Sequence, residues 1–196
     1  TTPKDVDDPT DGVISLREAI RSAASGELDP GDDGRFTITF ADSLFAETDQ
    51  VTVELFCTND FGRIQPAADI VIQGRTDGRS IALAVRNNQN APVFRIDSDR
   101  RFALRNLTVG FVCTVVTNGL VDAGFVHDYG EMEIADCLFE GCRQAFDAPM
   151  VQSFDGGVAT IERCSFVGSG RAPEKLTVDG GSLKVRNGDM RIIDCT

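Results

Sequence analysis

Few residue combinations in this chain could perform acid–base or nucleophilic chemistry. The single histidine, His127, is followed by Asp128 and Tyr129, and an imidazole beside a carboxylate could act as a general base. Adjacent residues of a strand point to opposite faces, so this spacing opposes a working dyad. The sequence contains no Gly-x-Ser-x-Gly elbow, phosphate-binding loop or dinucleotide fingerprint.

Chemistry on acidic polysaccharides is the main catalytic alternative. Hydrolysis needs paired carboxylates, and elimination needs a cation together with an arginine or lysine base. Asp32-Asp33 precedes the first expected strand, and Thr58-Asn59-Asp60 has the wrong order for a polygalacturonase-like motif. Arg105 and Arg163 are expected at equivalent outward positions of different repeats, where a solvated surface role is the simpler interpretation.

Calcium is the predicted cofactor. Asp5, Asp7, Asp8 and Asp11 lie close together just before Gly12 and offer the hard oxygen ligands that calcium prefers. Their spacing does not match an EF-hand. A second acidic loop at 29–34 flanks the other end of the expected helix, so the two loops could lie close together. A solvated acidic loop is the alternative.

The six cysteines include no Cys-x-x-Cys pair, so a structural zinc site is not indicated. Cys137, Cys164 and Cys195 share one position of a repeat, which is typical of small buried hydrophobic residues. Cys113 and Cys142 are 29 residues apart, about one repeat, and are the predicted disulfide pair. These features favour an oxidising compartment or a column of buried thiols.

One short helix is expected before a long β-rich region. Ser15 is the expected N-cap, Glu18 completes a capping box, and Gly26 suits the C′ position. After residue 34, short alternating apolar segments predict strands and leave no room for βαβ units. These segments are 36–40, 51–56, 69–74, 81–85 and 92–96. We expect residues 1–34 to form acidic loops and a capping helix, and residues 35–196 to form one β domain.

An internal repeat identifies the type of β structure. Leu107, Cys137, Cys164 and Cys195 occupy the same position of four similar segments, at spacings of 30, 27 and 31 residues. Such spacings are typical of one solenoid turn. A β-sandwich is the alternative, but it predicts hairpin turns and no sequence repeat. The predicted fold is therefore all-β, a right-handed parallel β-helix with a short N-terminal capping α-helix, and the glycine pairs at 156–157 and 180–181 are expected at its corners.

The run Ser15-Leu16-Arg17-Glu18-Ala19 resembles the CSLREA motif of bacterial surface proteins with a pectin-lyase-like β-helix. Ile14 stands where that motif has its leading cysteine. The segments CLFEG and CSFVG are more loosely similar to repeats of the chlamydial polymorphic outer membrane proteins. This resemblance implies secretion or surface display in a bacterium, with an architectural or adhesive role more often than catalysis.

Charge narrows the set of partners. The chain of 196 residues carries 19 basic and 31 acidic side chains, a net charge of −12, which opposes binding to nucleic acid or anionic lipid. No apolar run is long enough to predict membrane insertion. The predicted function is a non-catalytic extracellular module for surface architecture, adhesion or end-to-end filament assembly. The assembly edge is expected at Cys195 and Thr196, and the partners are further copies or other surface subunits. A polysaccharide lyase or hydrolase and a glycan-binding module are the alternatives.

Overall fold

The structure is a computed structural model of the chain. It describes residues 2–8, 10–25, 29–58, 62–88, 91–113, 124–140, 143–144, 150–167, 170–171 and 183–196.

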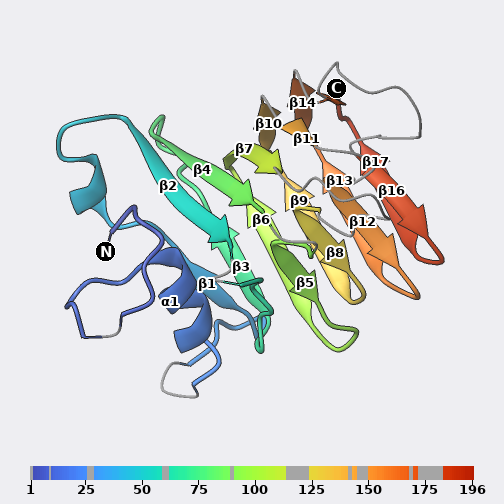
Figure 1. Cartoon of the computed structure of the whole chain (residues 1–196), viewed down its shortest axis with the longest axis horizontal. Helices are drawn as coiled ribbons and strands as arrows, with labels where there is room; N and C mark the ends of the chain where they lie inside the picture. Colours follow the sequence, from blue (N-terminus) through green and yellow to red (C-terminus); the bar gives the residue numbers. More distant parts are fainter. Residues whose placement is uncertain are drawn as a thin grey trace.

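The chain forms a β-solenoid with three parallel sheets (Figure 1). Sheet A contains β1 (Phe36–Ile38), β3 (Ile70–Gln73), β6 (Arg101–Arg105), β9 (Glu131–Ala135), β13 (Val158–Glu162) and β17 (Asp189–Ile193). Sheet B contains β2 (Gln50–Cys57), β4 (Ser80–Asn87), β7 (Thr108–Cys113), β10 (Leu138–Glu140), β11 (Arg143–Gln144), β14 (Ser165–Val167) and β15 (Gly170–Arg171). Sheet C contains β5 (Phe94–Ile96), β8 (Val126–Asp128), β12 (Val151–Phe154) and β16 (Leu183–Arg186). From β3 onward the strands visit the sheets in the order A, B, C, and in the first coil an isolated parallel bridge from Ile64 to Phe94 takes the place of a sheet C strand. This order confirms the predicted parallel β-helix.

The strand register aligns residues of similar type from successive coils in columns inside the solenoid. In sheet A, the pairing aligns an aliphatic column in successive coils: Ile72, Leu104, Ile134, Ile161 and Ile192. Phenylalanines add a second set of contacts, with Phe139 stacked on Phe166 at 4.8 Å between ring centroids. Each coil therefore buries its apolar side chains against the coils on either side.

The corners of the coils have distinct backbone requirements. Between sheets A and B, residues Asn106, Asp136, Arg163 and Asp194 all adopt positive φ values, from 50° to 54°. Between sheets C and A, Gly157 lies so close to the preceding coil that a Cβ atom would be 2.5 Å from the carbonyl oxygen of Asp128. The predicted corner at 156–157 is thus confirmed, whereas the pair at 180–181 lies outside the described residues.

A short helix closes the N-terminal end of the solenoid. Helix α1 (Leu16–Ser22) has Ser15 as its N-cap and Glu18 in a complete capping box, as predicted. Its residues Leu16 and Ile20 belong to the same buried cluster as the strands. The helix ends on Ala23 in the αR conformation, and the predicted C′ residue Gly26 is not among the described residues. A 3₁₀ helix (Asp42–Phe45) precedes β2.

Candidate functional site

The Ser15–Ala19 run has a structural role at the N-terminal end. Ser15 Oγ donates a hydrogen bond to the Val6 carbonyl at 2.6 Å, and Glu18 Oε1 accepts one from the Asp8 amide at 2.9 Å. Leu16 is buried in the core. The motif therefore fixes the N-terminal segment, residues 2–8, against the helix as well as capping the helix itself.

Arg17 and Asp5 form a buried ion pair that ties this segment to the first strand of sheet B. Arg17 Nε and Nη2 donate to the two Asp5 carboxylate oxygens at 2.9 Å, and both side chains are inaccessible to solvent. Asp5 Oδ2 also accepts a hydrogen bond from the Phe56 amide at 2.6 Å, and Arg17 donates to the Phe56 carbonyl. These bonds satisfy charges that would be costly to bury alone. No local sequence pattern marks this pair, because a loop separates Asp5 from Arg17.

The four aspartates of the predicted calcium site have different partners. Asp5 binds Arg17, Asp7 pairs with Arg21, Asp8 accepts hydrogen bonds from Thr10, and Asp11 accepts one from the Val13 amide. The hydrogen bonds from Thr10 hold the pKa of the Asp8 carboxyl below its usual value. No group of three or more metal-binding side chains occurs within the described ranges. Calcium binding stays a prediction.

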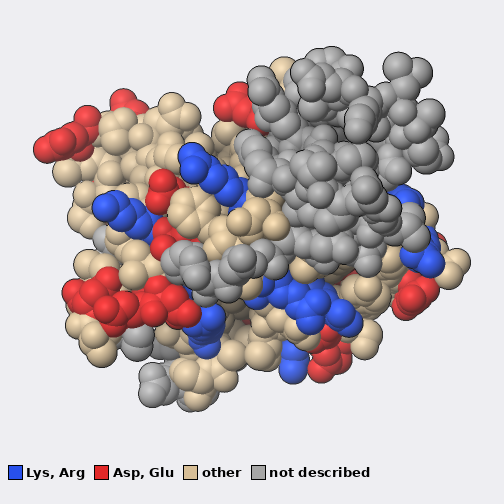
Figure 2. Space-filling view, viewed as in Figure 1, with Lys and Arg blue, Asp and Glu red and all other residues tan. Residues whose placement is uncertain are grey.

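Acidic side chains do gather over the N-terminal part of the molecule, as Figure 2 shows in the same view as Figure 1. In the second acidic loop, Asp33 pairs with Arg35 at 2.6 Å, and this contact lowers the pKa of the Asp33 carboxyl. The Asp33 carbonyl also accepts a hydrogen bond from Arg101 at 3.1 Å. This loop is therefore connected to sheet A through arginines.

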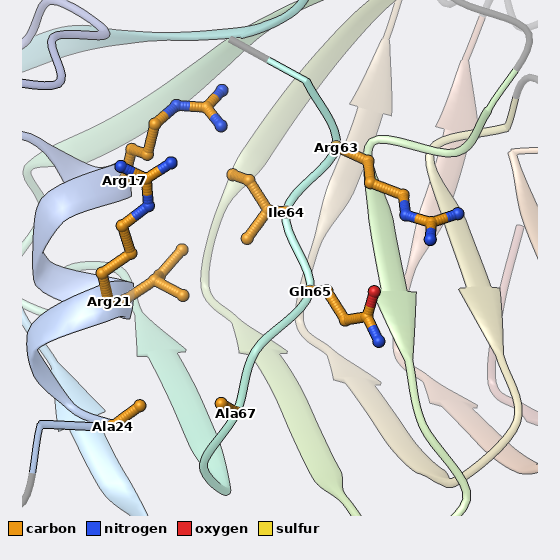
Figure 3. Close-up of a pocket in the computed structure, with 8 residues that line it drawn as sticks. Arg17, Arg21, Ala24, Arg63, Ile64, Gln65 and Ala67 are labelled. Carbon is orange, nitrogen blue, oxygen red and sulfur yellow. The ribbon is translucent and has the colours of Figure 1, made fainter.

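A pocket of about 270 Å³ lies between α1 and the segment 62–67 (Figure 3). Ile20, Ile64 and Ala67 contribute apolar wall, and three arginines contribute to its lining: Arg17, Arg21 and Arg63. Arg17 is committed to Asp5, and Figure 3 shows the Arg63 side chain directed away from the helix. The three guanidinium groups therefore do not converge on one anion in this pocket.

The sequence His127-Asp128-Tyr129 lies at the end of β8 and alternates between faces, as predicted. His127 shares a row with Arg95 and Gln152, whereas Asp128 shares a row with Ile96 and Ser153 inside the solenoid. Asp128 Oδ1 accepts a hydrogen bond from the Gly130 amide at 3.0 Å, but Oδ2 has no partner among the described residues. Burial raises the pKa of the Asp128 carboxyl to about 7. The alternation of residues along the strand predicted that His127 and Asp128 face opposite sides. It did not predict that the Asp128 carboxyl is buried with a raised pKa.

The expected equivalence of Arg105 and Arg163 is wrong by one residue. Register aligns Arg105 with Ala135 and with Glu162. The residue equivalent to Arg105 is therefore Glu162, and Arg163 lies one position later, just after the end of β13. Arg105 forms a two-pronged ion pair with Glu133 at 2.8 and 2.7 Å, and Arg163 forms one with Asp136 at 2.6 and 2.8 Å. These carboxylates raise the pKa of both guanidinium groups.

The repeated cysteines form a column of thiols at the start of sheet B. Their Sγ atoms donate to main-chain carbonyls of the preceding coil: Cys137 to Leu104, Cys164 to Ile134, and Cys195 to Ile161. Hydrogen bonding with Cys164 and burial raise the pKa of the Cys137 thiol, so that thiol stays protonated. Among the described cysteines, those of the column and Cys57 form no disulfide bond. Cys142 and the Cys113 side chain lie outside the described part, and their disulfide stays a prediction.

The C-terminal end of the solenoid exposes side chains whose equivalents in the four preceding coils are buried. In the sheet A column, Ile72, Leu104, Ile134 and Ile161 are each 0% exposed, whereas Ile192 is 55% exposed. In sheet C, Val185 follows Ser153 in the inward row and is 47% exposed. The predicted edge residues extend sheet B, because Thr196 donates to the Cys164 carbonyl at 3.0 Å and accepts from the Phe166 amide at 2.8 Å. Two apolar side chains of the last described coil are thus exposed at this end.

Comparison with protein-family models, curated proteins and solved structures gave no match. Within the described ranges, no helix has both the length and the apolar character needed to cross a membrane.

Proposed function

We propose that this chain is a non-catalytic β-helix module of cell-surface architecture that associates through its C-terminal end. The observation that carries the proposal is the exposed Ile192, whose equivalents in the four preceding coils are fully buried. An uncovered apolar column beside the edge of a parallel sheet favours pairing with another β-structure. The proposed surface location rests on the resemblance of the Ser15–Ala19 run to bacterial surface proteins.

The two ends of the solenoid differ, and this difference supports one mode of association. At the N-terminal end, α1 covers the core, and the Pro3 carbonyl accepts a hydrogen bond from the Glu54 amide at 2.7 Å, so the outer edge of β2 is occupied. A head-to-tail filament would have to displace this cap. Two copies of the 196-residue chain that meet through the side of the last coil need no such change and form a closed two-fold dimer. The predicted filament remains untested, and the proposed assembly is the dimer.

Sedimentation velocity of the 196-residue chain under reducing conditions tests this proposal. We expect a dimer for the parent chain and a monomer for Ile192→Asp, because the charge would have to be desolvated in the interface. Val167→Asp is the matched control: Val167 is 58% exposed but lies on the lateral face of sheet B, in the row of Glu140. This control variant should remain a dimer.

Two results would contradict the proposal. A parent chain that sediments as a monomer, or an Ile192→Asp variant that still dimerises, would exclude the C-terminal end as the interface. Circular dichroism checks that each variant is folded. Val185→Asp provides a second substitution on the same surface if Ile192→Asp does not fold.

A further inference from the structure

A polar pocket of about 220 Å³ lies at the corner between sheets A and B, away from the C-terminal end. Its lining combines charged, neutral polar and apolar side chains from three successive coils. These residues are Arg75, Arg79, Ser80, Ile81, Asn106, Leu107, Thr108, Asp136 and Leu138. We refer to this cavity as the corner pocket.

One wall of the corner pocket consists of two immobilised arginines. Arg75 and Arg79 both bind Asp42, at 2.9 and 2.8 Å, and both also pair with Asp77. Their guanidinium carbons lie 5.4 and 4.8 Å from the centroid of the Phe45 ring. Paired carboxylates and ring stacking fix these planar donors before any ligand arrives, which lowers the entropy lost on binding.

The opposite wall offers an acceptor and neutral hydrogen-bonding groups. Asp136 is held by Arg163, which also keeps the pKa of the Asp136 carboxyl below its usual value, so it is an ionised acceptor at neutral pH. The side chains of Asn106, Thr108 and Ser80 form no hydrogen bond with other described residues. Leu138 contributes partly exposed apolar surface between them.

The charges of this network are already paired with one another. Arg75 and Arg79 bind Asp42 and Asp77, and Arg163 binds both Asp136 and Glu162. Because each carboxylate is bound by a guanidinium group, the network offers no unpaired charge to an anion or a cation. Fixed donors and acceptors around a small apolar surface suit instead a ligand with several neutral hydroxyl groups on a compact ring.

We propose that the corner pocket binds a neutral monosaccharide unit of a glycan. The Asp136 carboxylate accepts a hydrogen bond from one ring hydroxyl, and the Asn106 amide and the Thr108 hydroxyl bond to others. Arg79 donates to a further oxygen, and Leu138 contacts the C–H face of the ring. This site does not depend on dimerisation, because none of its residues belongs to the exposed C-terminal end.

Titration of the ¹⁵N-labelled chain with methyl glycosides of glucose, galactose and mannose, followed by NMR, tests the site. We expect amide shifts confined to residues 79–81, 106–108 and 136–138 with at least one of these sugars. Thr108→Val keeps the shape of the side chain but removes its hydroxyl, and should weaken binding about tenfold. Thr52→Val is the control, because Thr52 occupies the same row of sheet B two coils earlier.

Asn106→Gly supplies a second test, since glycine tolerates the positive φ of 54° at this position while the amide is lost. It should also weaken binding. Binding of glucuronate or sulfate without binding of the neutral sugars would replace this proposal with an anion site. Shifts elsewhere on the molecule, unchanged affinity in Thr108→Val, or no response to any of the sugars would overturn it.

Discussion

At the scale of single residues, Asp128 has an environment unlike that of an exposed aspartate. It lies in an inward row between Ile96 and Ser153, and one of its oxygens lacks a hydrogen-bond partner within the described ranges. Burial disfavours the charged form, so the pKa in the folded protein rises from 3.8 to about 7. The folded state therefore retains a proton that the unfolded chain releases.

Stability should consequently depend on pH through this residue. Protonated Asp128 makes its full contribution to the free energy of unfolding below pH 3.8, and this contribution is lost as the pH rises through about 7. Across that interval, the loss is about 4 kcal/mol. Asp128→Asn cannot ionise, so its stability relative to the parent should improve by about this amount as the pH is raised. Urea unfolding at several pH values measures the difference.

The other carboxylates contribute equally to the pH dependence of Asp128→Asn and of the parent, so the difference in unfolding free energy between the two proteins reports on Asp128 alone. The exposed Asp99, whose partner Arg100 lies 3.4 Å away, provides a control, and Asp99→Asn should change the pH profile little. Parallel profiles for Asp128→Asn and the parent would show that Asp128 ionises normally.

At the scale of elements, the N-terminal segment and α1 act together as the cap of the solenoid. The Arg17–Asp5 pair joins the segment, the helix and β2 through four hydrogen bonds, two between the side chains and two to the Phe56 main chain. Both side chains are buried. Removing one partner leaves a buried charge without compensation, which is far more costly than losing a surface ion pair.

A double-mutant cycle measures this coupling. Arg17→Ala and Asp5→Ala should each lower the free energy of unfolding by about 3 to 5 kcal/mol, and the double variant should lose less than the sum. Arg21→Ala removes the exposed Asp7 pair and should cost less than about 1 kcal/mol. Additive single effects in the cycle would show that the two side chains act independently.

At the scale of the whole molecule, the solenoid is a stack in which each coil is stabilised by its neighbours. The central strand β9 pairs with both β6 and β13, whereas β17 pairs with β13 alone among the described strands. A coil that has a neighbour on one side only makes half of the interface that stabilises an internal coil. Local opening should therefore begin at the C-terminal end, because α1 and the N-terminal segment cover the other.

Hydrogen exchange tests this gradient directly. Amides of β16 and β17 should exchange faster than those of β9 and β13 in the monomeric Ile192→Asp variant. In the parent, dimerisation should slow exchange in β16 and β17 selectively. Uniform protection along the solenoid of the monomeric variant would contradict the stacked picture, and fastest exchange at β2 would show that the N-terminal cap is weak.

The sequence by itself determined the features that depend on neighbours along the chain. Alternation of apolar residues located the strands, the repeat of Leu107, Cys137, Cys164 and Cys195 identified the solenoid, and Ser15 with Glu18 located the start of α1. These features follow from local backbone geometry and from burial of one face. The same reasoning misaligned Arg105 and Arg163, because a shift of one residue moves a side chain to the other face of a strand.

Only the tertiary structure decided which residues meet across coils. The Arg17–Asp5 pair, the corner pocket and the exposure of Ile192 all depend on contacts between segments that are distant in the sequence. Ile161 and Ile192 occupy the same repeat position, yet one is buried and the other exposed, because only the first has a coil on each side. A repeat in the sequence specifies the shape of each coil, whereas its position in the stack determines the surface that it presents.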